Sequence, residues 1–144
     1  MSRLISPYEI VAKSALPALR AMVAKRLQND YHLTQQQVAK RLGVTQASVS
    51  NYARKTRGMM VNLEADDTVA KAADLIAKEL SSDEPDQREA LKSMTDVLDY
   101  IRFNKMMCTL HGDLEPGFPV EGCYACEGTF SEKNFERLKI LVGT

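Results

Sequence analysis

The chain has 144 residues, 44% of them hydrophobic, so it can bury a core and does not have the composition of a disordered protein. Its net charge is zero, and no stretch reaches the roughly 18 consecutive apolar residues that a membrane helix needs. Three cysteines are an odd number, which does not fit a disulfide framework. The N-terminus lacks the apolar core of a signal peptide, so we expect a cytoplasmic protein without a membrane partner.

Charge is unevenly distributed along the chain. Residues 1–60 contain ten basic side chains and two acidic ones, a net charge of +8, so the remainder carries −8. A basic segment of this size favours contact with a polyanion, while the acidic part keeps the protein soluble. A merely solvated basic surface is the alternative that charge alone leaves open.

The first helical pattern runs from Pro7 to Asn29, where apolar residues recur at helical intervals. Pro17 interrupts this pattern because proline cannot donate an amide hydrogen bond inside a helix. We therefore expect a kinked helix, or two helices of which the second is capped by Ser14 or Ala15.

The segment from Leu33 to Lys55 contains the start and stop signals of a short helix. Thr34 can cap its N-terminus, and Gln37 can return a hydrogen bond to the backbone of the cap. Gly43 supplies the left-handed residue that ends many helices. These signals predict a helix followed by a tight turn.

A second short helix follows this turn. Thr45 is its expected cap, and Val49 and Tyr52 form its apolar face. Two short helices joined by a tight turn are a helix-turn-helix.

This segment resembles the DNA-reading unit of the phage repressor and Cro-type (XRE) regulators. The residues that carry the resemblance are Gln35, Ala39, Gly43, Val44, Thr45, Gln46, Ser48 and Val49. More broadly, the run from Pro7 to a cysteine-bearing tail is similar to an archaeal group of predicted XRE-type transcriptional regulators. In that group a cysteine often follows the equivalent proline, whereas this chain has Tyr8, so one possible metal ligand is missing.

Polar side chains on the second helix are candidates for reading DNA. Gln and Asn can hydrogen-bond adenine through two atoms, and Ala can contact a thymine methyl group. The expected base-reading residues are Thr45, Gln46, Ala47, Ser48 and Asn51. By resemblance to the repressor family, the expected phosphate contacts are Gln35, Arg54, Lys55 and Arg57.

Two more helices are expected between residues 65 and 107. The first begins near Ala65 with Asp66 and Asp67 at its N-terminus, and the second has Pro85 in its first turn. The second helix carries an apolar stripe formed by Leu91, Met94, Val97, Leu98, Ile101 and Met106. Such a stripe is commonly core, but repressor-type proteins bind two half-sites as two-fold dimers. We therefore expect a homodimer through these helices and a palindromic operator.

The tail changes character to a Gly- and Pro-containing stretch without a helical period, before a final helix capped by Ser131. It contains two close pairs with the spacing of metal knuckles, Cys108 with His111 and Cys123 with Cys126. Three thiolates and one imidazole suit tetrahedral zinc, which we expect here. An iron–sulfur cluster and free thiols are the alternatives.

Two other classes of function stay open. Cys123 and Cys126 also form the CxxC pair of thiol-disulfide oxidoreductases, but that pair normally opens a helix in a βαβ unit, and no strand pattern surrounds it. A protein-interaction adaptor could use the helix-turn-helix for protein contacts.

Together these patterns predict an all-α, dimeric transcription regulator that is not an enzyme. We expect a repressor-like DNA-binding domain at residues 1–60, a helical dimerisation region at 61–107, and a small metal-bound loop tail with a C-terminal helix at 108–144.

Overall fold

The computed structural model describes residues 4–54 and 62–126. Helices, turns and extended segments make up this part of the chain, and it contains no strand. The all-α fold class is therefore confirmed. None of the described helices is long and apolar enough to span a membrane.

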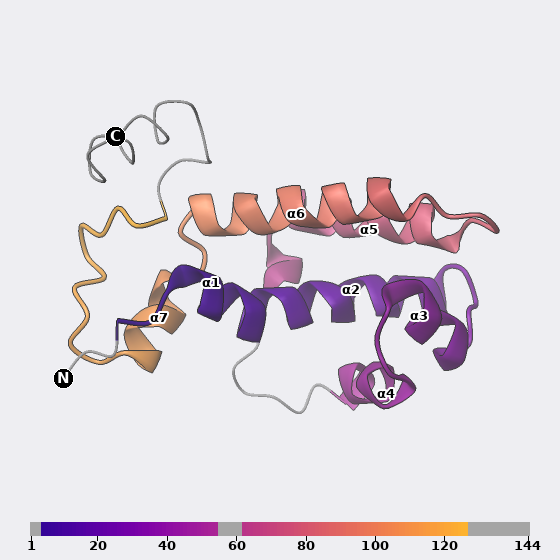
Figure 1. Ribbon diagram of the computed structural model, residues 1–144, viewed down its shortest axis with the longest axis horizontal. Helices are drawn as coiled ribbons and strands as arrows, with labels where there is room; N and C mark the ends of the chain where they lie inside the picture. Colours follow the sequence, from indigo (N-terminus) through magenta and orange to yellow (C-terminus); the bar gives the residue numbers. More distant parts are fainter. Residues whose placement is uncertain (1–3, 55–61, 127–144) are drawn as a thin grey trace, which may run out of the picture.

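The helices are arranged around one long N-terminal rod. In chain order the elements are α1 (Pro7–Ile10), a π-helical segment (Val11–Ala15), α2 (Leu16–Asn29), α3 (Gln35–Leu42), α4 (Gln46–Arg54), a 3-10 turn (Leu63–Ala65), α5 (Asp67–Ser81), α6 (Gln87–Phe103) and α7 (Cys108–Leu114). Figure 1 shows α5 and α6 running alongside α1 and α2, with α3 and α4 at one end of the rod and α7 at the other. The helix-turn-helix and the tail therefore lie at opposite ends of the same helix.

A wide π-helical turn joins the two halves of the N-terminal rod. Pro17 lies in the first turn of α2, where it cannot bond to a carbonyl group one turn earlier. The π-helical residues Val11–Ala15 come directly before this turn, and a local widening of the helix accommodates the missing bond. Ser14 does not cap α2, because its buried hydroxyl donates to the carbonyl oxygen of Ile10.

One hydrophobic cluster runs through the described helices. α2 packs against α5, α5 packs against α6, and α3 and α4 both pack against α2. Fully buried members are Leu19, Val23, Leu27, Val38, Val49, Val69, Ala73, Ile76 and Ile101. The division of the chain into segments 1–60, 61–107 and 108–144 stays a prediction.

The apolar stripe of α6 is divided between the core and the surface. Val97 and Ile101 are buried, and Met94 and Leu98 pack partly against the core. Leu91 is 64% exposed. Most of this stripe therefore stabilises the fold of a single chain.

Arg26 ties α2 to the 3-10 turn and to α5. Its Nη1 and Nη2 donate to the two carboxylate oxygens of Glu64 at 3.2 and 2.8 Å, and its Nε donates to Asp74. Desolvation acts to lower the pKa of Arg26, but these two carboxylates outweigh it and raise the pKa. Arg26 is one of the ten basic side chains of residues 1–60, and acidic groups of the same chain therefore balance its charge.

α5 and α6 both begin after an aspartate that caps the helix. Asp66 accepts a hydrogen bond of 2.9 Å from the amide of Val69, which agrees with the expected start of α5. The expectation for α6 was wrong, because Pro85 lies before the helix and not in its first turn. The carboxylate of Asp86 accepts from the amides of Arg88 and Glu89, so the helix starts after this cap.

The beginning of the tail is helical, which corrects the expectation of a loop. Met107 and His111 are buried on α7 and its N-terminal flank, while Leu110 and Leu114 pack against the core. Their spacing of three and four residues is a helical period that Gly112 and the prolines beyond it obscured. The expected helix capped by Ser131 lies outside the described residues.

Candidate DNA-reading surface and cysteine pocket

α3 begins and ends as its sequence predicts. The hydroxyl of Thr34 accepts from the amide of Gln37 at 3.2 Å, and the side chain of Gln37 accepts from the amide of Thr34 at 2.8 Å. Gly43 then adopts a left-handed conformation with φ of 69° and ends α3. The capping box and the glycine stop are both confirmed.

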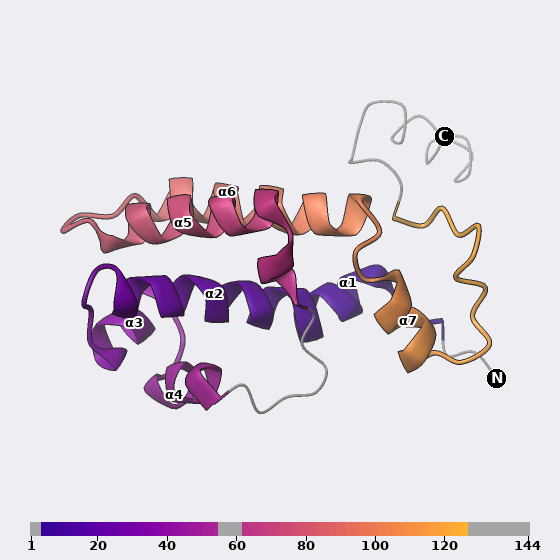
Figure 2. The ribbon, with the colours of Figure 1, turned by 180° about the vertical axis from the view of Figure 1, so that it is seen from behind.

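One face of α4 is held against the domain and the opposite face is open. The hydroxyl of Thr45 accepts from the amide of Ser48 at 3.0 Å at the start of the helix. Val49 is fully buried, and Tyr52 packs against the core. Among the side chains of α4 that the structure describes, the exposed ones are Gln46, Ala47 and Asn51. In both views α4 lies on the side of α2 that faces away from α5 and α6 (Figures 1 and 2), where a large partner can approach it.

The remaining expected DNA contacts differ in their exposure. Thr45 is exposed, whereas Gln35 and Ser48 are half-buried. The hydroxyl of Ser48 lies 2.9 Å from that of Thr45, so these two groups already share a hydrogen bond. The side chain of Arg54 lies outside the described part of the structure, as do Lys55 and Arg57.

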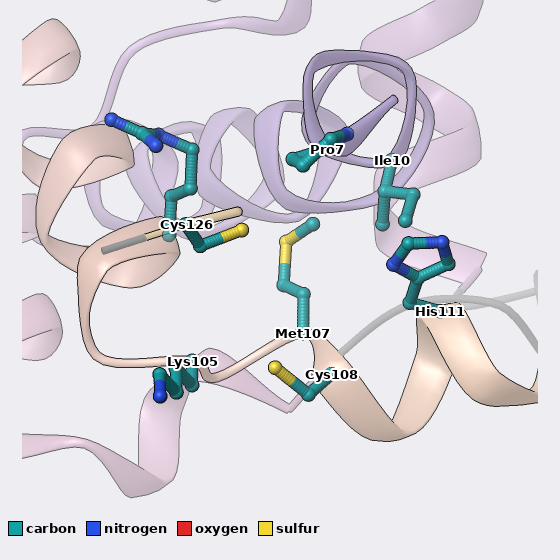
Figure 3. A pocket seen from close by; sticks show the side chains of 8 residues that line it. Pro7, Ile10, Lys105, Met107, Cys108, His111 and Cys126 are labelled. Carbon is teal, nitrogen blue, oxygen red and sulfur yellow. The ribbon is translucent and has the colours of Figure 1, made fainter. Parts of the chain in front are cut away.

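A small pocket lies at the other end of the rod. Three of the four expected metal ligands line it, namely Cys108, His111 and Cys126 (Figure 3). Its other walls come from α1 and from the end of α6 with the turn that follows, through Pro7, Ile10, Arg102, Lys105 and Met107. The fold thus brings the two cysteine-bearing segments of the tail against the start of the N-terminal helix.

The three cysteine side chains lie near one another. Cys108, Cys123 and Cys126 are half-buried and none forms a disulfide. Desolvation raises the pKa of Cys126, Arg102 acts in the opposite direction, and the nearby Cys108 and Cys123 add to the increase. Cys108 and Cys123 therefore both lie close enough to Cys126 to raise the pKa of its thiol.

His111 is already engaged on one side of its ring. Its Nε2 lies 3.2 Å from Oε1 of Glu115, and its ring stacks on Phe118 with 4.3 Å between the ring centroids. Burial acts to raise the pKa of Glu115, but hydrogen bonds from Ile5, His111 and Leu4 outweigh it and lower the pKa. Glu115 escaped notice in the sequence, although a carboxylate four residues after a histidine lies on the same helical face.

The described residues contain no group of three or more His, Cys, Asp or Glu side chains close enough to hold a metal ion together. The four-ligand metal centre therefore stays a prediction. Arg102 is a second residue of this region that sequence reasoning missed, and its guanidinium lies 5.6 Å from the ring centroid of Tyr8.

Comparison with known families supports the helix-turn-helix. Residues 17–57 match the model of the ParB helix-turn-helix (HTH) domain, and this segment contains α3, α4 and nearly all of α2. The chain therefore carries a helix-turn-helix DNA-binding domain. The narrower resemblance to XRE regulators and to an archaeal group stays a prediction. No curated protein and no solved structure matches the chain significantly.

Proposed function

We propose that the protein is a sequence-specific regulator of transcription that binds double-stranded DNA as a homodimer. The observation that carries this proposal is the open polar face of α4, opposite the buried Val49, inside the segment that matches a DNA-binding domain. In this proposal α4 enters the major groove, where Gln46 and Asn51 hydrogen-bond base edges and Ala47 contacts a thymine methyl group. Thr45 and Ser48 complete the reading surface.

Phosphate contacts are assigned to side chains that flank the reading surface. Gln35 begins α3 and Arg54 ends α4, and Lys55 and Arg57 come next in the sequence. Contacts of this kind fix the register of a protein on DNA and make its affinity depend on salt. Arg26 is excluded from this role, because Glu64 and Asp74 already occupy its guanidinium.

The dimer interface is assigned to the outer faces of α5 and α6. A single reading helix contacts few base pairs, and two copies related by a two-fold axis can read two half-sites about one helical turn, roughly 34 Å, apart. Leu75 on α5 is 67% exposed and Leu91 on α6 is 64% exposed. Because most of the α6 stripe is used inside one chain, these two leucines are the best candidates for contact with a second copy.

The tail is assigned one metal centre, with Cys108, His111, Cys123 and Cys126 as ligands and zinc as the favoured metal. Three of these residues line one pocket, and Arg102 beside Cys126 can offset the negative charge of bound thiolates. The chemistry of three thiolates and one imidazole fits zinc, and an iron–sulfur cluster is the alternative. The side chains must move closer together to share one ion, so metal binding would be coupled to a rearrangement of residues 108–126.

Selection of DNA from a random pool, followed by affinity measurements on the selected site and on random DNA, tests the DNA-binding proposal. Gln46→Ala should lose about 1–3 kcal/mol of binding free energy on the selected site and much less on random DNA. Gln87→Ala is the matched control, since Gln87 is an exposed glutamine at the start of α6. Equal losses for Gln46→Ala on both DNAs would contradict the base-reading role. Failure to bind any DNA in the presence of heparin would favour a protein-interaction adaptor.

A further inference from the structure

The helices α5 and α6 and the turn between them form a hairpin, and one arginine of α3 holds the turn of this hairpin. Arg41 is half-buried on α3, and its Nη1 donates a hydrogen bond of 3.2 Å to the carbonyl oxygen of Leu80 in the last turn of α5. The same nitrogen donates to the carbonyl oxygen of Ser82, which follows α5. These bonds join the first helix of the helix-turn-helix to the end of the hairpin.

Hydrogen bonds within the turn extend this contact to α6. The amide of Glu84 donates to the hydroxyl oxygen of Ser82 at 3.2 Å, and the amide of Asp86 donates to Oε1 of Glu79 at 2.8 Å. The carboxylate of Asp86 caps α6 by accepting from two amides of its first turn. Side chains and amides therefore connect α3 to the start of α6.

The two exposed leucines of the proposed dimer interface lie near this turn. Leu75 comes six residues before Ser81, where α5 ends, and Leu91 comes four residues after Gln87, where α6 begins. At 1.5 Å per helical residue these separations are roughly 9 and 6 Å. Figure 1 shows the turn of the hairpin at the end of the rod where α3 lies. A dimer formed through these leucines would therefore bring α3 of both copies close to the interface.

We infer that Arg41 is a positioning residue that sets the half-site spacing of the operator, because it fixes the helix-turn-helix relative to the hairpin that forms the dimer. The inference rests on the proposed dimer and adds the side chain that connects the dimer contact to the reading helices. No phosphate contact is assigned to Arg41, because its Nη1 donates to two carbonyl groups of the same chain.

The spacing of two half-sites is sensitive to the way in which the reading helices are held. Two copies of α4 bind two half-sites together only when the distance and the angle between the helices match the DNA. One added base pair moves a half-site by about 3.4 Å along the DNA and turns it by roughly 36° around the axis. A helix-turn-helix that is fixed to the hairpin cannot follow this change, whereas a loosely held one can.

Affinity for a series of DNA duplexes, measured with the full-length protein, tests the inference. The series carries the two half-sites of the DNA selected from the random pool, at the selected spacing or with one or two base pairs added or removed, and also a single half-site. A change of two base pairs should weaken wild-type binding about tenfold and binding by Arg41→Ala less than about threefold. Both proteins should bind the single half-site equally, because α4 is unchanged.

Three further variants separate positioning from a general loss of structure. Lys40→Ala is the matched control, since Lys40 is the adjacent exposed residue of α3, and it should keep the wild-type spacing preference. Arg41→Lys can still donate to the carbonyl groups and should restore most of the preference. Arg41→Met keeps an apolar stem without a donor, so it should behave as Arg41→Ala does and replaces that variant if alanine prevents folding. Circular dichroism establishes that each variant is folded at the temperature of the measurement.

Three results would overturn the inference, and they differ in what they leave standing. A wild-type spacing preference in Arg41→Ala and Arg41→Met would remove the positioning role and leave the DNA-binding dimer intact. Equal loss of affinity for a single half-site and for random DNA, with a weaker salt dependence, would make Arg41 a phosphate contact instead. Wild type that is monomeric in ultracentrifugation and binds one half-site as tightly as two would overturn the proposed dimer as well.

Discussion

Nη1 of Arg41 in α3 donates a hydrogen bond of 3.2 Å to the carbonyl oxygen of Leu80 in the last turn of α5. It also donates to the carbonyl oxygen of Ser82, which follows the helix. Carbonyl groups at a helix C-terminus lack partners within the helix, and the negative end of the helix dipole attracts a cation there. Arg41 therefore anchors the helix-turn-helix to the α5–α6 hairpin.

Replacing Arg41 with alanine should destabilise the protein by about 1–2 kcal/mol, because two terminal carbonyl groups lose a charged donor. Urea unfolding followed by circular dichroism measures this change. Lys40→Ala is the control, since Lys40 is the adjacent exposed basic residue on the same helix, and its stability should match that of the wild type. Equal destabilisation by the two substitutions would show that the Arg41 contact contributes nothing specific.

Arg26→Ala should cost about 1–2 kcal/mol of stability, because its two charged acceptors, Glu64 and Asp74, lose their shared donor. The side chain of Arg26 is 14% exposed, but those of Glu64 and Asp74 are 44% and 62% exposed, so water partly screens both ion pairs. Lys71→Ala provides the comparison at a solvent-exposed pair with Asp67 and should cost less than about 0.5 kcal/mol. Thermal or urea unfolding of both variants would reveal the difference, and similar small losses would refute it.

Gly43→Ala should destabilise the protein by about 1 kcal/mol, because an alanine at a φ of 69° carries a left-handed backbone penalty. Apart from Gly43 and its two chain neighbours, no described residue has an atom within 4 Å of the added Cβ position, so the cost should be conformational and not steric. Gly43→Asn should cost less, since asparagine tolerates this conformation better. A much larger loss for Gly43→Ala in urea unfolding would indicate a close contact at this turn.

Leu91→Glu should convert the proposed dimer to a monomer without loss of helix content, because Leu91 is 64% exposed in one chain and a buried charge would weaken the proposed interface. Analytical ultracentrifugation reports the mass, and circular dichroism reports the fold. Lys92→Ala is the control, since Lys92 is the adjacent exposed residue. A dimer that persists in Leu91→Glu, or a wild type that is already monomeric, would place self-association elsewhere or nowhere.

Protein purified without oxygen should contain one zinc ion per chain, and Cys123→Ser should lose it, because a tetrahedral site needs all four ligands. Limited proteolysis should then cut the tail faster and leave α3 and α4 intact, since they lie at the opposite end of the rod. Brown protein with iron and acid-labile sulfide would replace zinc with an iron–sulfur cluster. Metal-free wild type with the same protease pattern as Cys123→Ser would contradict both versions.

Features that depend on near neighbours in the chain could be predicted from the amino-acid sequence. The capping box of Thr34 and Gln37, the left-handed Gly43 and the cap at Asp66 were all predictable, because each involves groups within a few residues of one another. The open face of α4 was predictable too, since the period of a helix places Ala47 and Asn51 on the side opposite Val49. The start of α6 was missed because Pro85 and Asp86 are competing start signals side by side.

Which charged groups already have partners depends on contacts between distant segments of the fold. The partners of Arg26 lie 38 and 48 residues away, Leu80 lies 39 residues from Arg41, and the amides bound to Glu115 lie 110 and 111 residues away. A count of charges does not distinguish Arg26 and Arg41 from other basic residues. In the fold, both guanidinium groups already donate hydrogen bonds to acceptors of the same chain. Helical periodicity identifies the apolar face of each helix but not the surface that covers it, and for this reason the contacts between distant segments could not be predicted.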